Sequence, residues 1–307
     1  MRIYISKVNE SWVVNRFRKE WYENNKKIST KSILNSDIVW IIAPWSIKSR
    51  VLKKLKNKKV VCTIHHIESM DKDSQDIKRI KELDRYVDEY HTISQKSFDQ
   101  LNKITEKKIN LIPFWVDNNK WFRIENSFEI REKFDLSSND YLLGSFQRDT
   151  EGHDLVSPKL IKGPDIFLEI VKRMSKFNPN LKVILTGKRR NYLLNEFQKN
   201  NIKYKYFEMV NIQTLNELYN ILDLYIVSSR IEGGPQSVME CSAAKVPIIS
   251  TDVGIASDIL SPDSIFKIGE DHKAKPNLDT QYNNVIKYFI PEGMKQFQVM
   301  FQNLNES

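Results

Sequence analysis

The sequence predicts an α/β fold in which two domains each contain a parallel β-sheet. Short apolar segments alternate along the chain with segments whose apolar residues recur at helical spacing, a pattern typical of strand–helix–strand units. At 307 residues the chain has room for two domains of ordinary size. Residues 230–258 combine a polar loop, a helical pattern and a short buried strand, and the rest of the chain is organised around this stretch.

The first third of the chain is expected to form a sheet of parallel strands connected by helices. Its first helix places Trp12, Phe17 and Trp21 on one stripe, which a helix packed on a sheet would bury. Basic residues alternate with these aromatic residues, so the same segment also fits a membrane surface. The expected strands span residues 1–6, 37–44, 58–66, 89–94 and 108–113, and the expected helices span residues 12–24, 47–57, 74–87 and 95–104.

A second α/β unit is expected to begin near Tyr141. Its first strand and first helix are separated by a long polar loop, residues 147–165, and a loop of this length in a compact domain is usually functional. The expected strands span residues 141–147, 181–187, 204–209, 224–229 and 246–250, and the expected helices span residues 165–177, 191–200 and 214–222. We therefore expect domains over residues 1–135 and 136–277, and a helical tail over residues 278–307 that packs back on the first domain.

The net charge of +9 is concentrated in the first part of the chain. Residues 1–70 carry 15 Lys and Arg against 5 Asp and Glu, and the remainder is close to neutral. Such a surface suits an anionic membrane, an anionic acceptor or nucleic acid, although a solvated lysine-rich surface explains the charge equally well. No zinc-ligand spacing or RNA-binding aromatic motif supports nucleic acid as the partner.

The chain has neither a run of about 18 apolar residues nor the features of a signal peptide at its start. Cys62 and Cys241 stand in a strand and a helix, away from any metal-ligand spacing, and are interpreted as buried free thiols. These observations predict a cytoplasmic protein, with attachment to the inner face of the membrane as an option that the basic segment leaves open.

Two glutamates bracket the start of the helix in residues 230–258. Gly233 and Gly234 allow a ligand to approach the backbone closely, and Pro235 fits the first turn of a helix. The free N–H groups of that turn can bind hydroxyls or an anion, and Glu240, about one turn later, can accept hydrogen bonds from vicinal hydroxyls. The alternative is that Glu232 only caps the helix and Glu240 is only solvated.

Cations and histidines stand at the carboxyl ends of two expected strands. Arg148 and Lys162 lie at the two ends of the long loop, where they could neutralise a diphosphate beside a helix N-terminus. An ordinary mobile surface loop with scattered charge is the alternative. In the first domain His65, His66 and Glu68 follow the third strand, at the edge where ligands collect in open α/β sheets.

In combination, these motifs resemble family 4 of the retaining glycosyltransferases, whose GT-B architecture has two Rossmann-like domains facing each other across a cleft. The resemblance is carried by EGGPQSVME (residues 232–240), SAAKVPIISTDVG (residues 242–254), KGPD (residues 162–165) and LIPFWVDNNKWF (residues 111–122). It implies that the first domain lies on the acceptor side and that the second binds a nucleotide sugar.

The resemblance also implies roles for single residues. Glu240 would hold the ribose hydroxyls of the donor and Glu232 would lie near the donor sugar, while Arg148 and Lys162 would bind the donor diphosphate. His65 would face the donor sugar, with His66 as the fallback. The remaining implied donor contacts are Gly144, Gly233, Gly234, Pro235 and Gln236.

The implied reaction moves a sugar from a UDP- or GDP-sugar to a glycan or lipid-linked acceptor, with retention and without a metal ion or other cofactor. The two cations would take the place of a divalent ion on the diphosphate. Biosynthesis of a cell-surface polysaccharide is the implied setting. Two alternatives stay open: a non-catalytic nucleotide-sugar-binding protein of the same fold, and a glycosyltransferase that acts on nucleic acid.

Overall fold

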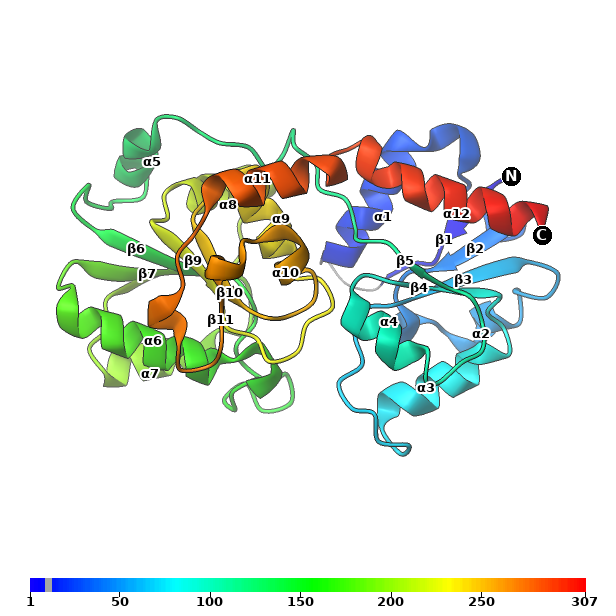
Figure 1. The fold of residues 1–307 in the computed structure, drawn as a ribbon, viewed down its shortest axis with the longest axis horizontal. Coiled ribbons are helices and arrows are strands. Elements are labelled where there is room, and N and C mark those ends of the chain that lie inside the picture. The colour runs from blue at the N-terminus through cyan, green and yellow to red at the C-terminus, as the bar shows by residue number, and fades with distance from the viewer. Residues whose placement is uncertain (9–12) are drawn as a thin grey trace. The chain divides into compact units, whose positions relative to one another are not determined.

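The computed structural model describes residues 1–8 and 13–307, which form two compact units (Figure 1). Unit 1 contains residues Met1–Trp115 and Ile290–Ser307, and unit 2 contains Val116–Phe289. The expected boundaries after residues 135 and 277 both lie within unit 2. The start of the expected tail packs on that unit, where Gln281 Nε2 donates to Val246 O at 2.8 Å, and so does the connector before residue 135. There the Ile124 N–H donates to Asn220 Oδ1 at 2.8 Å. Trp12, expected in the core, lies outside the described residues.

Unit 1 contains a five-stranded parallel sheet with the strand order β1-β2-β3-β4-β5. Helices cover both of its faces (Figure 1). The strands are β1 (Ile3–Ile5), β2 (Ile38–Ile41), β3 (Lys59–Ile64), β4 (Glu89–Thr92) and β5 (Ile109–Leu111). The helices are α1 (Val13–Asn24), η1 (Lys26–Ile28), η2 (Pro44–Ser46), α2 (Ser49–Leu52), α3 (Gln75–Asp84), α4 (Gln95–Leu101), η7 (Glu292–Met294) and α12 (Lys295–Glu306).

The alternation of side chains along β2 gives each face of this sheet its own core. Val39 and Ile41 point into the cluster under α3 and α4, whereas Trp40 points to the other face. There the Trp40 ring lies 5.3 Å from the ring of Phe301 on α12 and 5.7 Å from the ring of Trp21 on α1. The C-terminal helix is therefore an integral part of the core of unit 1.

The expected helix over residues 47–57 is much shorter in the structure, where α2 spans only Ser49–Leu52. The lysine-rich residues that follow form successive turns, in which the N–H of Lys54 donates to Val51 O and the N–H of Leu55 donates to Leu52 O. Asn57 then adopts a left-handed backbone with φ of 64°, which no helix can continue through.

Unit 2 contains a six-stranded parallel sheet with the order β11-β10-β9-β6-β7-β8. The apolar faces of α6 and α7 cover one side of it. The strands are β6 (Tyr141–Ser145), β7 (Leu181–Thr186), β8 (Tyr204–Phe207), β9 (Leu224–Val227), β10 (Ile248–Thr251) and β11 (Ile265–Phe266). The helices are α5 (Ser127–Lys133), η3 (Leu160–Lys162), α6 (Pro164–Phe177), α7 (Asn191–Lys199), α8 (Ile212–Asn220), α9 (Gln236–Ala243), α10 (Ala256–Ile259), η4 (Pro262–Ser264), η5 (Asp271–Lys273), α11 (Leu278–Val285) and η6 (Ile286–Tyr288).

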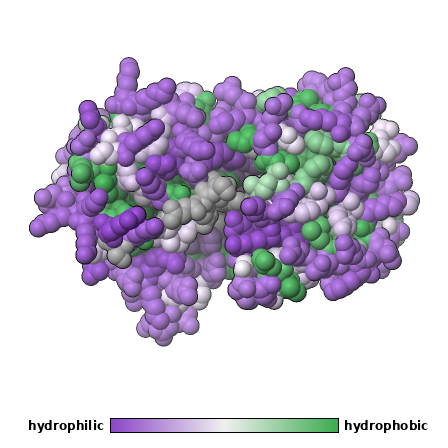
Figure 2. All heavy atoms as spheres, turned by 180° about the vertical axis from the view of Figure 1, so that it is seen from behind, coloured by the Kyte–Doolittle hydropathy of each residue, from purple (hydrophilic) through white to green (hydrophobic). Residues whose placement is uncertain are grey.

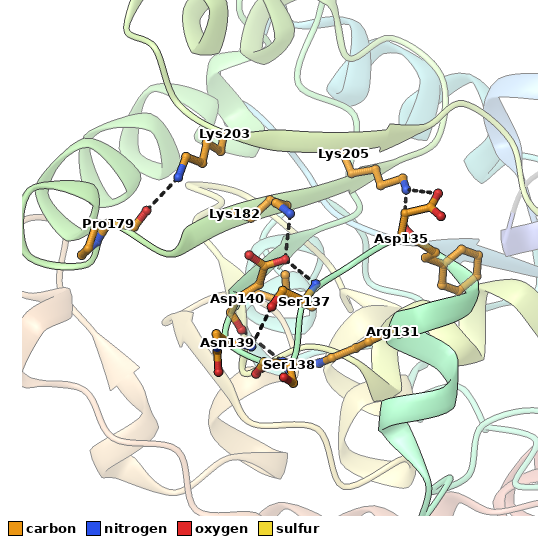
Figure 3. A network of polar contacts seen from close by, with 12 residues as sticks. Arg131, Asp135, Ser137, Ser138, Asn139, Asp140, Pro179, Lys182, Lys203 and Lys205 are labelled. Carbon is orange, nitrogen blue, oxygen red and sulfur yellow. Dashed lines mark hydrogen bonds and ion pairs between the residues drawn. The ribbon is translucent and has the colours of Figure 1, made fainter.

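At the amino ends of the strands of unit 2, charged side chains form ion pairs and hydrogen bonds with neighbouring segments. Figure 3 shows Lys182 of β7 pointing toward Asp140, with 2.7 Å between Nζ and Oδ2, and Lys205 of β8 pointing toward Asp135, with 3.2 Å between Nζ and Oδ2. Arg131 of α5 donates from Nη1 to the carbonyl oxygen of Asp140 at 3.0 Å. The carboxyl ends of the strands, on the opposite edge, are where this fold binds ligands.

The face drawn in Figure 2 is mostly hydrophilic, and its hydrophobic side chains form small separate groups. Within the described residues no helix has the length and apolar character needed to span a membrane. Cys62 and Cys241 are both buried and unpaired, which confirms the interpretation of their thiols.

Candidate active site

The strand order of unit 2 marks the place where a ligand is expected. From β6 the chain proceeds to β7 and β8 on one side, and then returns to β9, β10 and β11 on the other. Adjacent strands β6 and β9 therefore form a topological switch point, and a crevice outside their carboxyl ends is the usual ligand site of an open α/β sheet. Gln147 follows β6 and Ser229 follows β9, and Ser229 Oγ lies 3.0 Å from Gln147 Oε1.

Lys162 and Glu232 meet at this switch point. Lys162 Nζ lies 2.6 Å from Glu232 Oε1, and the two side chains are 19% and 12% exposed. Gln147 Nε2 donates to the carbonyl oxygen of Lys162 at 2.7 Å, and Ser229 Oγ lies 3.2 Å from Glu232 Oε1. The ammonium group is thus held by a network, yet it stays accessible to an anionic ligand that competes with the carboxylate.

A second ion pair holds together the two segments that carry these residues. Arg230 donates from Nη1 and Nη2 to the two carboxylate oxygens of Asp165 at 2.8 and 2.6 Å, a bidentate pairing. Hydrogen bonding to Arg230 is the main cause that lowers the pKa of Asp165. The main-chain N–H of Arg230 also donates to Ile161 O at 2.8 Å. The loop after β9 is consequently fixed against the start of α6.

Two glycines allow the loops of the site to pack main chain against main chain. Gly163 has φ of 62°, and a Cβ there would lie 1.8 Å from the carbonyl oxygen of Ser228. Gly254 has φ of 57°, and a Cβ there would lie 2.4 Å from the carbonyl oxygen of Gly233. Any side chain at either position would push the loop after β9 out of place.

Glu240 lies within α9 and is held by a residue of α8. Tyr219 donates its hydroxyl proton to Glu240 Oε2 at 2.8 Å, and both side chains are buried, with 2% and 4% exposed. Burial raises the pKa of Tyr219 well above its ordinary value, and the nearby Glu240 carboxylate is the next largest cause. The Tyr219 hydroxyl therefore stays protonated and remains the donor of this hydrogen bond. Tyr219 therefore fixes the orientation of the carboxylate.

The remaining donor-contact candidates of unit 2 occupy several positions around these residues. Pro235 is the N-cap of α9 and Gln236 is its first residue, one position later than the sequence indicated. Arg148 directly follows Gln147 at the end of β6, next to the buried Asp149. Gly144 lies inside β6, where a Cβ would come within 2.2 Å of the Leu222 side chain, so packing accounts for this glycine.

In unit 1, His65 follows β3 and is enclosed by two aromatic rings. Its ring centroid lies 5.1 Å from that of Trp45 and 5.8 Å from that of Phe114. Burial lowers the pKa of His65 to about 4, so the imidazole is neutral near pH 7. Because its Nε2 lies 2.8 Å from Ile42 O, that nitrogen carries the proton and Nδ1 is left as an acceptor. His66 lies nearer the surface, 3.4 Å from Glu68.

Several residues that shape the site were not expected from the sequence: Gln147, Ser229, Tyr219 and Trp45. The first two lie just beyond the carboxyl ends of β6 and β9, so knowledge of the strand order would have identified them. Within residues 1–8 and 13–307, no three His, Cys, Asp or Glu side chains lie close enough together to hold a metal ion.

Solved structures of similar fold come from glycosyltransferases. The chain matches HepE of Anabaena in complex with UDP at a TM-score of 0.77 and 12% identity, over 98% of this chain and 99% of that one. It matches sucrose-phosphate synthase of Thermosynechococcus elongatus at a TM-score of 0.70 and 14% identity, over 96% of this chain and 78% of that one. It matches a mutant of TarM of S. aureus at a TM-score of 0.63 and 16% identity, over 96% of this chain and 58% of that one. The two Rossmann-like units thus have the GT-B fold, as expected.

The sequence of unit 2 identifies the enzyme class. No curated protein matches the chain at a significant level. Residues 157–284, however, match the sequence model of the family described as glycosyl transferases group 1, and this stretch includes Lys162, Glu232 and Glu240. The chain is therefore a glycosyltransferase, which confirms the enzyme class that the motifs predicted, and the match to this family lies within its second unit.

Proposed function

We propose that this glycosyltransferase takes a sugar from a nucleoside diphosphate sugar and transfers it, with retention of configuration and without a metal ion, to a glycan or lipid-linked acceptor. The observation that carries the proposal is the ion pair between Lys162 and Glu232 at the switch point, 2.6 Å long and partly exposed. It offers one cation for a diphosphate and, beside it, one carboxylate for a sugar hydroxyl.

The donor is assigned to unit 2. Glu240 accepts hydrogen bonds from the ribose hydroxyls, and Glu232 lies at the transferred sugar, as the resemblance to the retaining family implies. The main-chain N–H groups of Gly233, Gly234 and Gln236 bind sugar hydroxyls or phosphate oxygens at the start of α9. UDP-glucose is the first donor to test, because HepE has been solved in complex with it. A GDP-sugar is the second.

The reaction breaks the bond between the anomeric carbon of the sugar and the diphosphate oxygen, and the electron pair stays on the diphosphate. The acceptor oxygen bonds to the anomeric carbon on the face that the diphosphate leaves, and its proton passes to an oxygen of the departing phosphate. Lys162 and Arg148 stabilise the charge that develops on the diphosphate. The role of a divalent ion is thereby assigned to protein cations.

His65 is assigned to the donor sugar. Its neutral imidazole has Nδ1 available as an acceptor, which suits a sugar hydroxyl better than a phosphate. His66 is the fallback for this role.

The test is incubation with UDP-glucose or GDP-mannose, with and without EDTA, followed by measurement of nucleotide release and by NMR of the sugar product. We expect release of UDP or GDP that EDTA leaves unchanged, and a first-formed sugar product with the α-configuration of the donor. A β-product would overturn retention, loss of activity in EDTA would overturn metal independence, and failure to bind or cleave either donor would overturn the donor assignment.

A further inference from the structure

Unit 1 contains a basic pocket that lies outside the proposed donor site. It is an open hollow with a volume of about 460 Å³. We call it the α1–η1 pocket, because its walls come from α1 and from the turn and extended segment that follow. Its lining residues are Arg18, Lys19, Tyr22, Glu23, Lys26, Ser29, Thr30 and Lys31.

The charge of this pocket is strongly positive, with four cations against the single carboxylate of Glu23. Lys19, Lys26 and Lys31 are exposed, and none of them makes an ion pair or a side-chain hydrogen bond with any residue that the structure describes. Three ammonium groups around one hollow repel one another unless an anion lies between them. Their arrangement therefore favours an anionic ligand.

The fourth cation is held in a fixed orientation. Arg18 donates from Nε to Ile5 O at 3.2 Å, and its guanidinium lies 5.1 Å from the centroid of the Tyr22 ring. The Tyr22 hydroxyl accepts from the Ile5 N–H and donates to Thr30 O, both at 3.0 Å. These contacts order the Arg18 side chain before any ligand arrives, which lowers the entropic cost of binding.

Two hydroxyl groups add donors to the pocket. Ser29 Oγ accepts from Trp21 Nε1 at 3.1 Å, and Thr30 Oγ1 accepts from the N–H of Ser32 at 3.2 Å. Each hydroxyl also carries a proton that it can donate to a ligand. The groups that face a ligand are thus mainly donors, and phosphate oxygens are acceptors.

The turn that forms one wall is anchored to the C-terminal helix. Asn25 is 5% exposed, and its Oδ1 accepts from Gln298 Nε2 of α12 at 2.7 Å. Asn25 Nδ2 lies 3.3 Å from Met294 Sδ. The segment that carries Lys26 is therefore fixed to the core of unit 1 and is not a loose loop with scattered charge.

A second basic pocket of about 560 Å³ lies near the amino ends of β3 and β4, and its lysines differ from those of the α1–η1 pocket in their hydrogen bonding. There Lys58 Nζ donates to Leu34 O at 3.0 Å, and Lys107 Nζ donates to the carbonyl oxygens of Asp84 and Val87. Those ammonium groups are used to hold the unit's own backbone. Among the described residues, Lys19, Lys26 and Lys31 of the α1–η1 pocket make no such hydrogen bond.

We propose that the α1–η1 pocket binds a phosphate-bearing anion, supplied either as a soluble polyphosphate or as the headgroup of an anionic phospholipid. Lys19, Lys26, Lys31 and Arg18 contact the phosphate oxygens, and the hydroxyls of Ser29 and Thr30 donate to them. The proposal is independent of the donor site in unit 2, so either assignment can fail without the other.

Two probes test the proposal on the full chain. Inorganic tripolyphosphate is titrated by calorimetry, and vesicles of phosphatidylcholine with and without phosphatidylglycerol are sedimented with the protein. The pocket variant is Lys26→Gln with Lys31→Gln. The matched control is Lys27→Gln with Lys103→Gln, which removes the same charge from exposed lysines of unit 1 that do not line the pocket.

We expect wild type and control to bind one of the probes equally, and the pocket variant to bind it about tenfold more weakly or worse. Added salt should weaken this binding. The probe that binds identifies the source of the phosphate. Equal weakening in both variants would show that only net charge matters and would overturn the proposal, as would failure of the wild type to bind either probe. Circular dichroism checks that both variants are folded.

Discussion

Lys162 Nζ lies 2.6 Å from Glu232 Oε1, although the two residues are 70 positions apart in the chain. The lysine lies near the end of the long loop after β6, and the glutamate lies in the loop after β9. The pair therefore connects these two loops at the switch point of the sheet of unit 2. Both side chains remain partly exposed, and an ion pair in contact with water is weak enough to be exchanged for another partner. The pair can therefore hold Lys162 in place until a diphosphate arrives.

Replacing Lys162 by methionine should lower kcat/KM for donor cleavage about hundredfold or more, because a fixed cation at the leaving diphosphate is lost. Glu232→Gln keeps the size of the side chain but removes its charge, and we expect it to lower the rate as well. The two changes should not be additive, since the residues are in direct contact. Steady-state kinetics of both variants and of the double variant measure this coupling.

Lys172→Met is the matched control for Lys162→Met, because Lys172 forms an ion pair with the exposed Glu169 of the same helix, at 3.1 Å. Its activity should equal that of the wild type. Near-normal cleavage by Lys162→Met would remove this lysine from the reaction.

Tyr219→Phe should weaken donor binding through Glu240. The change removes the hydroxyl that donates to Glu240 Oε2 at 2.8 Å but keeps the ring, which packs against Trp121 and Phe146. The carboxylate then loses a partner in a buried site, so we expect KM for the donor to rise about tenfold while kcat changes less. Initial-rate kinetics across donor concentrations separate the two constants.

Tyr204→Phe serves as the control for this change, because the Tyr204 hydroxyl accepts from the exposed Gln198 at 3.2 Å, near the amino end of β8. Unchanged KM in Tyr219→Phe would mean that the orientation of Glu240 does not depend on Tyr219.

The sequence identified both members of the main ion pair but not their contact. Glycines, a proline and a helical pattern around Glu232 indicate a loop before a helix from local residues alone. The contact with Lys162 depends on β6 and β9 being neighbours, a property of strand order that local patterns do not encode. For the same reason Gln147 and Ser229, which bridge those two strands, were not foreseen.

The length of one helix was also predicted wrongly from the sequence. The expected helix over residues 47–57 has apolar residues at helical spacing, yet α2 ends at Leu52. The lysines that follow repel one another along one turn and gain no tertiary packing, so turns with Asn57 at positive φ replace the helix. The expected tail over residues 278–307 is divided between the units, because α11 packs in unit 2, whereas Phe297 and Phe301 of α12 are buried in unit 1.

Breaking the buried ion pair between Asp149 of the long loop and Arg190 should destabilise unit 2. Asp149 Oδ2 accepts from Arg190 Nε at 2.5 Å, and the two side chains are 2% and 0% exposed. Arg190→Met leaves the Asp149 carboxylate buried without its main partner, which costs about 3–5 kcal/mol of unfolding free energy. Adding Asp149→Leu should recover much of this loss, because a buried apolar pair needs no charge compensation. Urea denaturation measures both variants.

The control is Lys199→Met, which breaks an exposed pair with Glu196 on α7 and should cost less than about 1 kcal/mol. If the double variant were less stable than Arg190→Met, the aspartate would be held by other partners, such as the Thr150 hydroxyl that donates to it at 2.6 Å.

His91 should make the stability of unit 1 depend on pH. It is fully buried, its Nε2 lies 2.7 Å from Ile112 O, and its Nδ1 lies 2.9 Å from Thr63 Oγ1, which in turn accepts from Trp40 Nε1 at 2.8 Å. The neutral ring satisfies every one of these hydrogen bonds, whereas a proton on Nδ1 would face the proton of Thr63. Burial lowers the pKa of His91 from 6.5 to about 3.

Because the folded-state pKa lies below the unfolded one, this contribution to stability is complete above about pH 6.5 and decreases as the pH falls toward 3. At pH 5 the loss should be about 2 kcal/mol relative to pH 7.5. Urea denaturation followed by tryptophan fluorescence measures it, since Trp21, Trp40 and Trp115 pack in the core of unit 1.

His91→Gln should be less stable than wild type at pH 7.5, yet lose about 2 kcal/mol less of unfolding free energy on acidification to pH 5. His65 should contribute to the decrease that remains, because burial also lowers its pKa, to about 4. An unchanged difference between the two pH values in His91→Gln would show that His91 is not the group that titrates.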